Sequence, residues 1–296
     1  MKEKPFSKYQ ILANAVMIIW TLAIILPFIL LFMSSITDEN TLVANGYSFF
    51  PKKFSLASYS YIIKSGGQIL KAYGVSIGVT VVGTLLNVLL SALMAYPLSV
   101  KNLPGRNVMM FFVFFTMLFN GGIVPSYIMW TGTFHIKDTI FAQLLPNFLL
   151  SAWNVMMIRT YFTTSIPDGL YEAAEIDGAS QFTIFWKIVL PLGKPILVTM
   201  GTFAGLAYWN DWTNGLYYIV KNTGLYNVQN LLNQMVQNIQ FLTQSSNSNV
   251  TAAASTIPAT GIQMAIAFVA ILLIMLIFPS FQKYYAKGIA LGAVKG

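Results

Sequence analysis

The chain alternates between long apolar stretches and short charged segments. Uncharged runs of 29, 29 and 30 residues separate Lys8 from Asp38, Lys71 from Lys101, and Arg106 from Lys137. A helix needs about 20 apolar residues to cross the hydrocarbon core of a bilayer. The pattern therefore predicts an all-α membrane protein, a single domain over 1–296 with six transmembrane helices. These are expected at 12–34, 74–98, 108–130, 140–162, 195–219 and 261–281.

Composition supports lipid as the solvent of most of the surface. Hydrophobic residues make up 56% of the chain and charged residues only 9%, whereas soluble domains carry about a quarter charged residues. The net charge of +8 comes from basic residues too dispersed for a nucleic-acid patch, so we expect no nucleic-acid partner. The absence of cysteine excludes disulfides and thiolate chemistry. His135 is the single histidine and is expected to be a loop residue.

The first apolar run has two interpretations. Three lysines precede it, as they would precede a cleaved signal peptide. Its apolar length, however, exceeds the usual signal core of about 7–15 residues, and no cleavage-site pattern follows promptly. We therefore expect a retained transmembrane helix.

The distribution of basic residues predicts the topology. With six spans and a cytoplasmic N-terminus, 11 of the 17 basic residues fall on cytoplasmic segments and 6 on outer ones. Cytoplasmic segments of membrane proteins carry an excess of Lys and Arg. We therefore expect a multi-pass protein with both termini in the cytoplasm.

Two longer outer segments are expected, at 35–73 and 220–260. Within the second, apolar residues at Val228, Leu231, Leu232 and Met235 follow a helical period on an otherwise polar stretch. This helix could pack on the bundle surface, or it could dock an external partner.

The predicted cytoplasmic loop 163–194 is too polar to cross a membrane and too regular for a simple linker. Ser165 and Asp168 have the spacing of a capping box, with Pro167 in the first turn. Gly178 is expected to end this helix in a left-handed conformation, and Ser180 to cap a second helix. Phe182, with three apolar residues that follow at helical spacing, gives that second helix an apolar face. The loop is thus expected to form a helix–turn–helix.

The same loop carries a recognisable spacing of residue types. It reads Glu172-Ala173-Ala174, three residues, Gly178, nine residues, Ile188, one residue, Leu190-Pro191. This resembles the EAA loop of bacterial ABC importer permeases, and it lies before the penultimate span as in that family. An amphipathic hairpin without a partner is the alternative interpretation. The resemblance implies docking to an ATPase through Glu172, Ala173, Ala174, Asp177, Gly178, Ile188, Leu190 and Pro191.

Further segments resemble a narrower group. Trp209-Asn210-Asp211-Trp212 resembles a segment of maltose-type carbohydrate permeases. The stretches 119–127 and 281–296 resemble the branch associated with oligosaccharides and polysaccharide fragments. The resemblance implies four kinds of partner: a second homologous permease subunit, an ATPase dimer, an extracytoplasmic solute-binding protein and the sugar.

Asp211 is the one acidic residue inside a predicted span. Such residues usually face a partner or water, because an unpaired carboxylate in a bilayer is costly. Aromatic rings and hydrogen-bonding groups surround it in sequence, which suits sugar binding. The alternative is an interfacial aromatic belt. The predicted substrate path comprises Tyr208, Trp209, Asn210, Asp211, Trp212 and Asn120.

The third predicted span contains residues that disfavour a continuous helix. Asn120-Gly121-Gly122 and Pro125 either interrupt the span beside a cavity or mark its end. Both interpretations stay open at this point.

The expected function is import without catalysis by this chain. No GxxxxGK[ST] phosphate loop is present, so ATP and Mg²⁺ are expected on the partner ATPase and no cofactor on this chain. An ion-coupled secondary transporter would need ionisable residues deep in several spans, and an intramembrane enzyme would need paired acids or a nucleophile pair. An ABC importer of a non-sugar solute is the nearer alternative. The expected location is the bacterial cytoplasmic membrane.

Overall fold

The computed structural model describes residues 8–64, 66–244, 260–272 and 275–276. These residues are predominantly helical, and they contain no strand beyond one isolated bridge between Thr37 and Phe54. The chain divides into two compact units, Met1–Gly67 with Leu232–Met275, and Gln68–Leu231 with Leu276–Gly296. The polar stretch after 244, the end of the predicted sixth span and the tail 281–296 lie outside the described residues.

Unit 1 contains the first predicted span and the last. α1 (Lys8–Ser35) has apolar side chains exposed along most of its length, as expected where lipid is the solvent. α2 (Glu39–Asn45), α3 (Ala57–Lys64), the later part of α14 (Val228–Gln244) and a helix at Thr260–Leu272 complete it. The carboxylate of Glu39 accepts hydrogen bonds from the amides of Thr260 and Gly261 at 2.9 and 2.8 Å, so it holds the start of that last helix.

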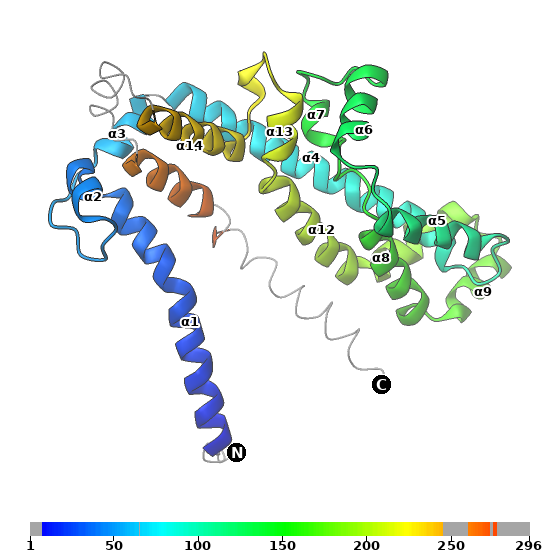
Figure 1. Ribbon diagram of the computed structural model, residues 1–296. Coiled ribbons are helices and arrows are strands. Elements are labelled where there is room, and N and C mark those ends of the chain that lie inside the picture. Colours follow the sequence, from blue (N-terminus) through cyan, green and yellow to red (C-terminus); the bar gives the residue numbers. More distant parts are fainter. Residues whose placement is uncertain (1–7, 65, 245–259, 273–274, 277–296) are drawn as a thin grey trace. The chain divides into compact units, whose positions relative to one another are not determined.

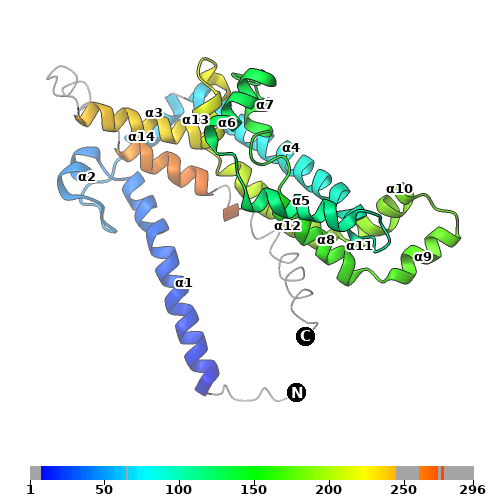
Figure 2. The same cartoon turned by 45° about the vertical axis from the view of Figure 1, so that its right-hand side comes forward.

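Unit 2 contains the remaining spans and the predicted cytoplasmic loop. Its long helix is α4 (Gly66–Ser99), and shorter helices follow along the chain. In both views α9 lies at one end of this unit, and α6, α7 and α13 gather toward the other (Figures 1 and 2). The shorter elements are α5 (Arg106–Leu118), α6 (Ile123–Ile128), η1 (Met129–Thr133), α7 (Phe141–Leu144), α8 (Ala152–Ser165), α9 (Asp168–Ile176), α10 (Gln181–Ile184), η2 (Phe185–Val189), α11 (Leu190–Leu192), α12 (Lys194–Trp209), α13 (Thr213–Tyr218) and η3 (Thr223–Leu225).

Small residues let α4 and α12 approach closely. A Cβ added at Gly205 would lie 3.3 Å from Thr84 Oγ1, and one at Gly83 would collide with the ring of Tyr208. Glycines at such contacts are typical of packed membrane helices, because van der Waals packing takes the place of hydrophobic burial there. α12 also packs against α8, which in turn packs against α5.

The described residues confirm a helical membrane fold without confirming six spans. Two helices, Lys8–Ser35 and Gly67–Ser99, are long and apolar enough to cross a bilayer, and two bent pairs raise this number to at most four. The pairs are Arg106–Leu118 with Ile123–Thr133, bent by 109°, and Gln181–Leu192 with Lys194–Trp209, bent by 78°. The second bend lies between Leu192 and Lys194, a break flanked by Pro191 and Pro195.

The segment 140–162, expected as one helix, is instead two helices. α7 ends at Leu144, and an irregular stretch precedes α8 at Ala152. Pro146 lacks the amide that a continuing helix would need, and Asn147 has a left-handed φ of 68°. Likewise, 195–219 is interrupted after Trp209 before α13 begins.

Candidate functional site

The loop with the EAA spacing folds as a helical hairpin. α9 is its first arm, and α10, η2 and α11 form its second arm from Gln181 to Leu192. The turn between the arms is short, and in Figure 2 the hairpin stands at the end of unit 2 beyond α8. This confirms the predicted helix–turn–helix.

The two faces of α9 differ in exposure. Glu172, Ala173 and Asp177 are exposed, whereas Ala174 is buried. Ala174 packs into the hydrophobic cluster that also contains Ile184 and Phe185. One face of α9 is therefore used for the fold, and the other, with two carboxylates and a small side chain, is free for a partner.

Tyr171 holds α9 against the membrane helices. Its ring stacks on that of Tyr96 with centroids 6.4 Å apart. Burial of the hydroxyl raises the pKa of Tyr171 to about 12. The side chain therefore stays neutral at physiological pH and acts as an aromatic anchor for the exposed face.

Gly178 adopts the predicted left-handed conformation, with a φ of 76°. The amide of Asp177 donates to the carbonyl of Ala173 at 3.0 Å, and the amide of Ala179 to that of Ala174 at 2.9 Å. These bonds satisfy the last carbonyls of α9. A Cβ at Gly178 would meet no atom within 4 Å, so the demand for glycine is conformational and not steric.

The two predicted caps of the hairpin have different outcomes. Ser180 caps the second arm, since its hydroxyl accepts from the Thr183 amide at 3.2 Å. The capping box from Ser165 to Asp168 is wrong: α8 runs through Ser165, and the N-cap of α9 is Pro167 without a side-chain bond. The cause is Pro167, which forces Ile166 into an extended conformation.

The apolar face expected on the second arm is divided. Phe185 and Val189 are buried, whereas Phe182 and Trp186 are exposed and pack edge-to-face with centroids 5.9 Å apart. The π-helical turn of η2 accompanies this division. Of the remaining predicted docking residues, Ile188 and Leu190 are half-buried and Pro191 is exposed.

Polar contacts tie the hairpin to α4. Tyr96 donates from its hydroxyl to Gln181 Oε1 at 2.6 Å, and Gln181 Nε2 donates to Glu175 Oε1 at 2.8 Å. Lys101, just beyond α4, pairs with Asp168 at the start of α9. Each arm is thus connected to the end of a long membrane helix.

The predicted substrate path does not form one exposed surface within this chain. Tyr208, Trp209 and Asp211 are buried, whereas Asn210 and Trp212 are exposed. The hydroxyl of Tyr208 donates to the Leu144 carbonyl at 2.9 Å. Tyr208 is therefore engaged by the backbone of its own unit.

Asp211 organises the start of α13. Its Oδ1 accepts from the Thr213 amide at 3.0 Å, from the Thr213 hydroxyl at 2.9 Å and from the Asn214 amide at 3.2 Å. Helix N-termini leave such amides without intrahelical partners, and a carboxylate is a strong acceptor for them. Asp211 Oδ1 thus has a structural role inside this chain, whereas Oδ2 is buried without a hydrogen-bond partner among the described residues.

Asn120 lies at a sharp bend. Its Oδ1 accepts from the Gly122 amide at 2.8 Å, and Gly122 has a φ of 85°. Here α5 ends and α6 begins in a different direction, which gives the 109° bend. Asn120 is exposed beside that bend. The chain is broken there and does not continue as a straight helix.

A cluster of buried amide side chains was not anticipated from the sequence. Asn227 Nδ2 donates to the Asp211 carbonyl at 2.6 Å, and its Oδ1 accepts from the Asn230 amide at 2.8 Å. Asn230 Nδ2 donates to the Trp212 carbonyl, and Gln143 Nε2 donates to the Leu225 carbonyl at 3.2 Å. We call Gln143, Asn214, Asn227 and Asn230 the amide cluster.

Amides also satisfy the irregular stretch before α8. Asn214 Nδ2 donates to the Pro146 carbonyl at 3.1 Å, and Asn87 Nδ2 donates to the Phe148 carbonyl at 2.6 Å. Asn154 in turn donates to Asn87 at 2.7 Å. Non-helical backbone in a membrane protein requires such partners, because lipid provides none. The signal in the sequence was the presence of Asn and Gln in uncharged apolar runs.

A second acidic residue fixes the turn beside α13. Asp138 Oδ1 accepts from the amides of Lys221, Val220 and Asn222 at 2.7, 2.7 and 3.2 Å. These hydrogen bonds, that of Lys221 foremost, hold the pKa of Asp138 below its usual range. Next to it, Lys137 Nζ lies 3.1 Å from the hydroxyl of Tyr127.

The described residues contain no group of three His, Cys, Asp or Glu side chains that could hold a metal ion. His135 is exposed in the loop after η1, with a φ of 51°.

Two relatives from Bacillus subtilis match most of the chain. "Protein LplC" is 36% identical over 272 residues, which cover 92% of this chain and 90% of the relative. A polygalacturonan/rhamnogalacturonan transport system permease protein is 35% identical over 288 residues, covering 97% and 98%. The similarity therefore extends beyond the EAA loop to both units.

A solved structure and a family model agree with this similarity. A bacterial ABC transporter involved in the import of the acidic polysaccharide alginate has a chain with a TM-score of 0.79 and 25% identity, covering 96% of this chain and all of that one. The model of the binding-protein-dependent transport system inner membrane component matches residues 72–291. The chain therefore belongs to the family of inner membrane components of binding-protein-dependent transport systems.

Proposed function

We propose that this chain is the permease subunit of an ABC importer that moves oligosaccharides or polysaccharide fragments across the cytoplasmic membrane. The observation that carries the proposal is the hairpin, whose α9 has one face packed on the bundle and one face exposed. A helix held in this way is suited to enter a preformed cleft on another subunit. Movement of that subunit would be transmitted directly to α4, because polar contacts connect the hairpin to the end of that helix.

The docking surface of the proposal is the exposed part of the hairpin. Glu172 and Asp177 offer charge to the ATPase, and Ala173 allows close approach. Ile188 and Leu190 are half-buried in the second arm, and Pro191 lies exposed just before its end at Leu192. ATP and Mg²⁺ would be bound by the ATPase dimer, and closure of that dimer would drive the permease between inward-facing and outward-facing states.

The topology of the proposal has six spans and both termini in the cytoplasm. α1 and α4 each supply one span, and the bent pair α5 and α6 supplies another. α7 with α8 would supply a fourth span despite the irregular stretch, and α12 with α13 a fifth. The helix at Thr260–Leu272 would begin the sixth. The hairpin then lies inside, and the amide cluster lies toward the outside.

The sugar class rests on the names of the relatives and on exposed groups. Among similar proteins are a polygalacturonan/rhamnogalacturonan permease and an arabinooligosaccharide permease, each of Bacillus subtilis. In this chain Trp212, Asn210 and Asn120 are exposed. An aromatic face and amide groups are the chemistry that sugars require. The exposed groups of that path would be supported by the buried side chains of Tyr208, Trp209 and Asp211.

The test is reconstitution in vesicles of the chain with the second permease, the ATPase dimer and the solute-binding protein. We expect ATP-dependent uptake of a labelled oligogalacturonide or arabino-oligosaccharide only when all components are present. Uptake by the chain alone under an ion gradient would contradict the proposal and favour a secondary transporter. ATP-dependent uptake of a non-sugar solute with no sugar uptake would retain the ABC importer and overturn the sugar class.

A further inference from the structure

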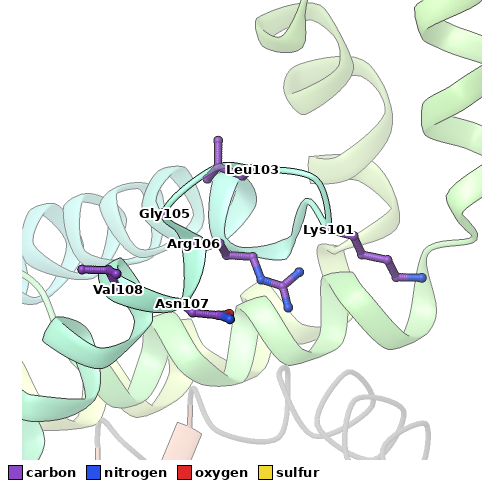
Figure 3. Close-up of a pocket in the computed structure, with 6 residues that line it drawn as sticks. All are labelled: Lys101, Leu103, Gly105, Arg106, Asn107 and Val108. Atoms are coloured by element: carbon purple, nitrogen blue, oxygen red, sulfur yellow. The ribbon is translucent and has the colours of Figure 1, made fainter.

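An open pocket of about 250 Å³ lies at the turn between α4 and α5. In Figure 3 the charged ends of Lys101 and Arg106 lie on the same side of the turn as the amide of Asn107, and Leu103 points away from them. The pocket is lined by Lys101, Leu103, Gly105, Arg106, Asn107 and Val108.

Lys101 at this turn pairs with Asp168, whereas the charges of Arg106 and Arg159 have no carboxylate partner among the described residues. Arg106 is close enough to Arg159 for the two charges to repel each other. Each guanidinium has one hydrogen bond to a backbone carbonyl, from Arg106 to Val100 and from Arg159 to Leu98. Neither arginine forms an ion pair within the part of the chain that the structure describes. A guanidinium carries five N–H donors, so most of theirs remain available to an anion.

The backbone adds to the same potential. α5 has 13 residues, and its N-cap is Gly105, which has a φ of 74° and no side chain to accept from the first turn. That turn therefore presents amide groups and the positive end of the helix dipole beside Arg106. Asn107 supplies a further donor at the pocket wall.

The pocket also has apolar lining residues, Leu103, which is half-buried, and Val108, which is 60% exposed. One turn further along α5, Phe112 is 62% exposed and extends the apolar surface away from the pocket. A ligand that suits both features has an anionic oxygen group and a hydrocarbon part. An acidic protein segment would use the charge but leave the apolar surface uncovered, and free phosphate would do the same.

We propose that this pocket binds the phosphate of an anionic phospholipid from the cytoplasmic leaflet. The proposal rests on the topology proposed above, which places the turn at the inner face of the membrane. Clusters of Lys and Arg at that position attract anionic lipid headgroups. The acyl chains would lie along the exposed side of α5.

The site also connects to the hairpin. Lys101 lines the pocket and at the same time pairs with Asp168 at the start of α9. A bound phosphate and the Asp168 carboxylate would compete for the same ammonium group. Anionic lipid would thus loosen one of the contacts that hold the hairpin to the end of α4.

The experiment counts phosphatidylglycerol retained by the purified complete importer, by native mass spectrometry after transfer from phosphatidylcholine vesicles with added phosphatidylglycerol. Arg106→Gln should reduce retained phosphatidylglycerol about fivefold, the value of one basic group near a membrane surface. Arg106→Lys, which keeps the charge, should recover most of it. Lys221→Gln, a lysine of the proposed outer face, should match the parent.

Asp168→Asn makes the competition visible. Since this change frees Lys101, it should raise retention of phosphatidylglycerol, whereas Lys101→Gln should lower it. Parental retention by Arg106→Gln, or an Asp168→Asn effect in the opposite direction, would overturn the proposal. Displacement of the lipid by millimolar inorganic phosphate would assign the pocket to free phosphate instead. Loss of the ATPase subunit from Arg106→Gln at unchanged lipid would assign it to a protein contact.

Lipid retention is measured without transport. A complex that retains phosphatidylglycerol in this pattern but imports no sugar would leave the lipid site standing and count against the sugar proposal alone.

Discussion

The two ends of unit 2 use polar residues in opposite ways. At the hairpin end Glu172, Asp177 and Asp168 are exposed, and their carboxylates make few contacts with the fold. At the other end Asp211 and the amide cluster are buried, and the amide groups bond to the chain's own backbone and to one another, whereas Asp211 Oδ2 has no partner among the described residues. Exposed charge at the first end is available to a partner, whereas buried amides at the second replace the water that lipid excludes.

This difference distinguishes residues that are available to bind a partner from residues that stabilise the fold. A motif with several polar residues can indicate either role, and burial decides between them. The Trp209–Trp212 segment was expected to line a sugar path, but Asp211 Oδ1 is bonded to the amides that begin α13, and Trp209 is buried.

The amide cluster should be the most sensitive part of the fold. Asn227→Leu removes donors to the Asp211 carbonyl and to Gln143 Oε1, and it leaves the Asn230 amide without its acceptor. Buried groups left unsatisfied cost about 1–3 kcal/mol each. We expect the free energy of unfolding in detergent to fall by about 3 kcal/mol.

Asn238 lies on the same helix, α14, and is exposed. Asn238→Leu is therefore the control, and its unfolding midpoint should match that of the parent. Equal midpoints for the two variants would show that the cluster does not stabilise this end.

Substitutions of Asp211 distinguish a structural role of its carboxylate from a role in binding sugar. Asp211→Asn keeps an oxygen acceptor for the Thr213 and Asn214 amides, whereas Asp211→Ala removes it. Loss of an acceptor at a helix start costs about 1–2 kcal/mol. We expect Asp211→Ala to be destabilised and Asp211→Asn to keep both stability and sugar uptake. A folded Asp211→Asn variant that loses uptake would instead assign the carboxylate to the sugar.

Asp138 should give a small dependence on pH. Its hydrogen-bonded carboxylate has a pKa below the usual value of about 3.9, so the ionised form is favoured in the folded state. Its contribution to stability is therefore complete at neutral pH and is lost as the pH falls below about 4, through the folded-state pKa. Hydrogen exchange of the Val220 and Lys221 amides should show this change, corrected for intrinsic rates. Asp138→Asn should remove it, and the same pH dependence in Asp138→Asn would assign the effect to another group.

The hairpin was largely predictable because its determinants are local. Gly178 and Ser180 act within a few residues of their own positions, so turn and capping preferences were sufficient. The predicted capping box at Ser165 was wrong for an equally local reason. Pro167 restricts the backbone of Ile166 to an extended conformation, and a capping hydroxyl does not override this restriction.

The amide cluster was not predictable in the same way. Gln143 and Asn230 are 87 residues apart, and only the folded chain brings them together. An amide side chain in an apolar run indicates that a hydrogen-bond partner is needed, but the sequence does not identify that partner. The break at Pro146 was hidden for a related reason, since its carbonyl is satisfied by the distant Asn214.

The most direct test of the account is whether the geometry of Gly178 controls coupling. Gly178 has open space around it, so Gly178→Val acts through a backbone strain of about 1–2 kcal/mol. Gly178→Asn is the matched control, because asparagine tolerates the left-handed region. Each variant is purified with its partners, and ATPase content and sugar-stimulated ATP hydrolysis are measured. We expect Gly178→Val to lower coupled hydrolysis about tenfold at unchanged membrane insertion, and Gly178→Asn to stay near the parent. Ala173→Glu, which changes only the exposed face, should lower ATPase association as well. Parental assembly and coupling in both Gly178→Val and Ala173→Glu would show that the hairpin is not the coupling element.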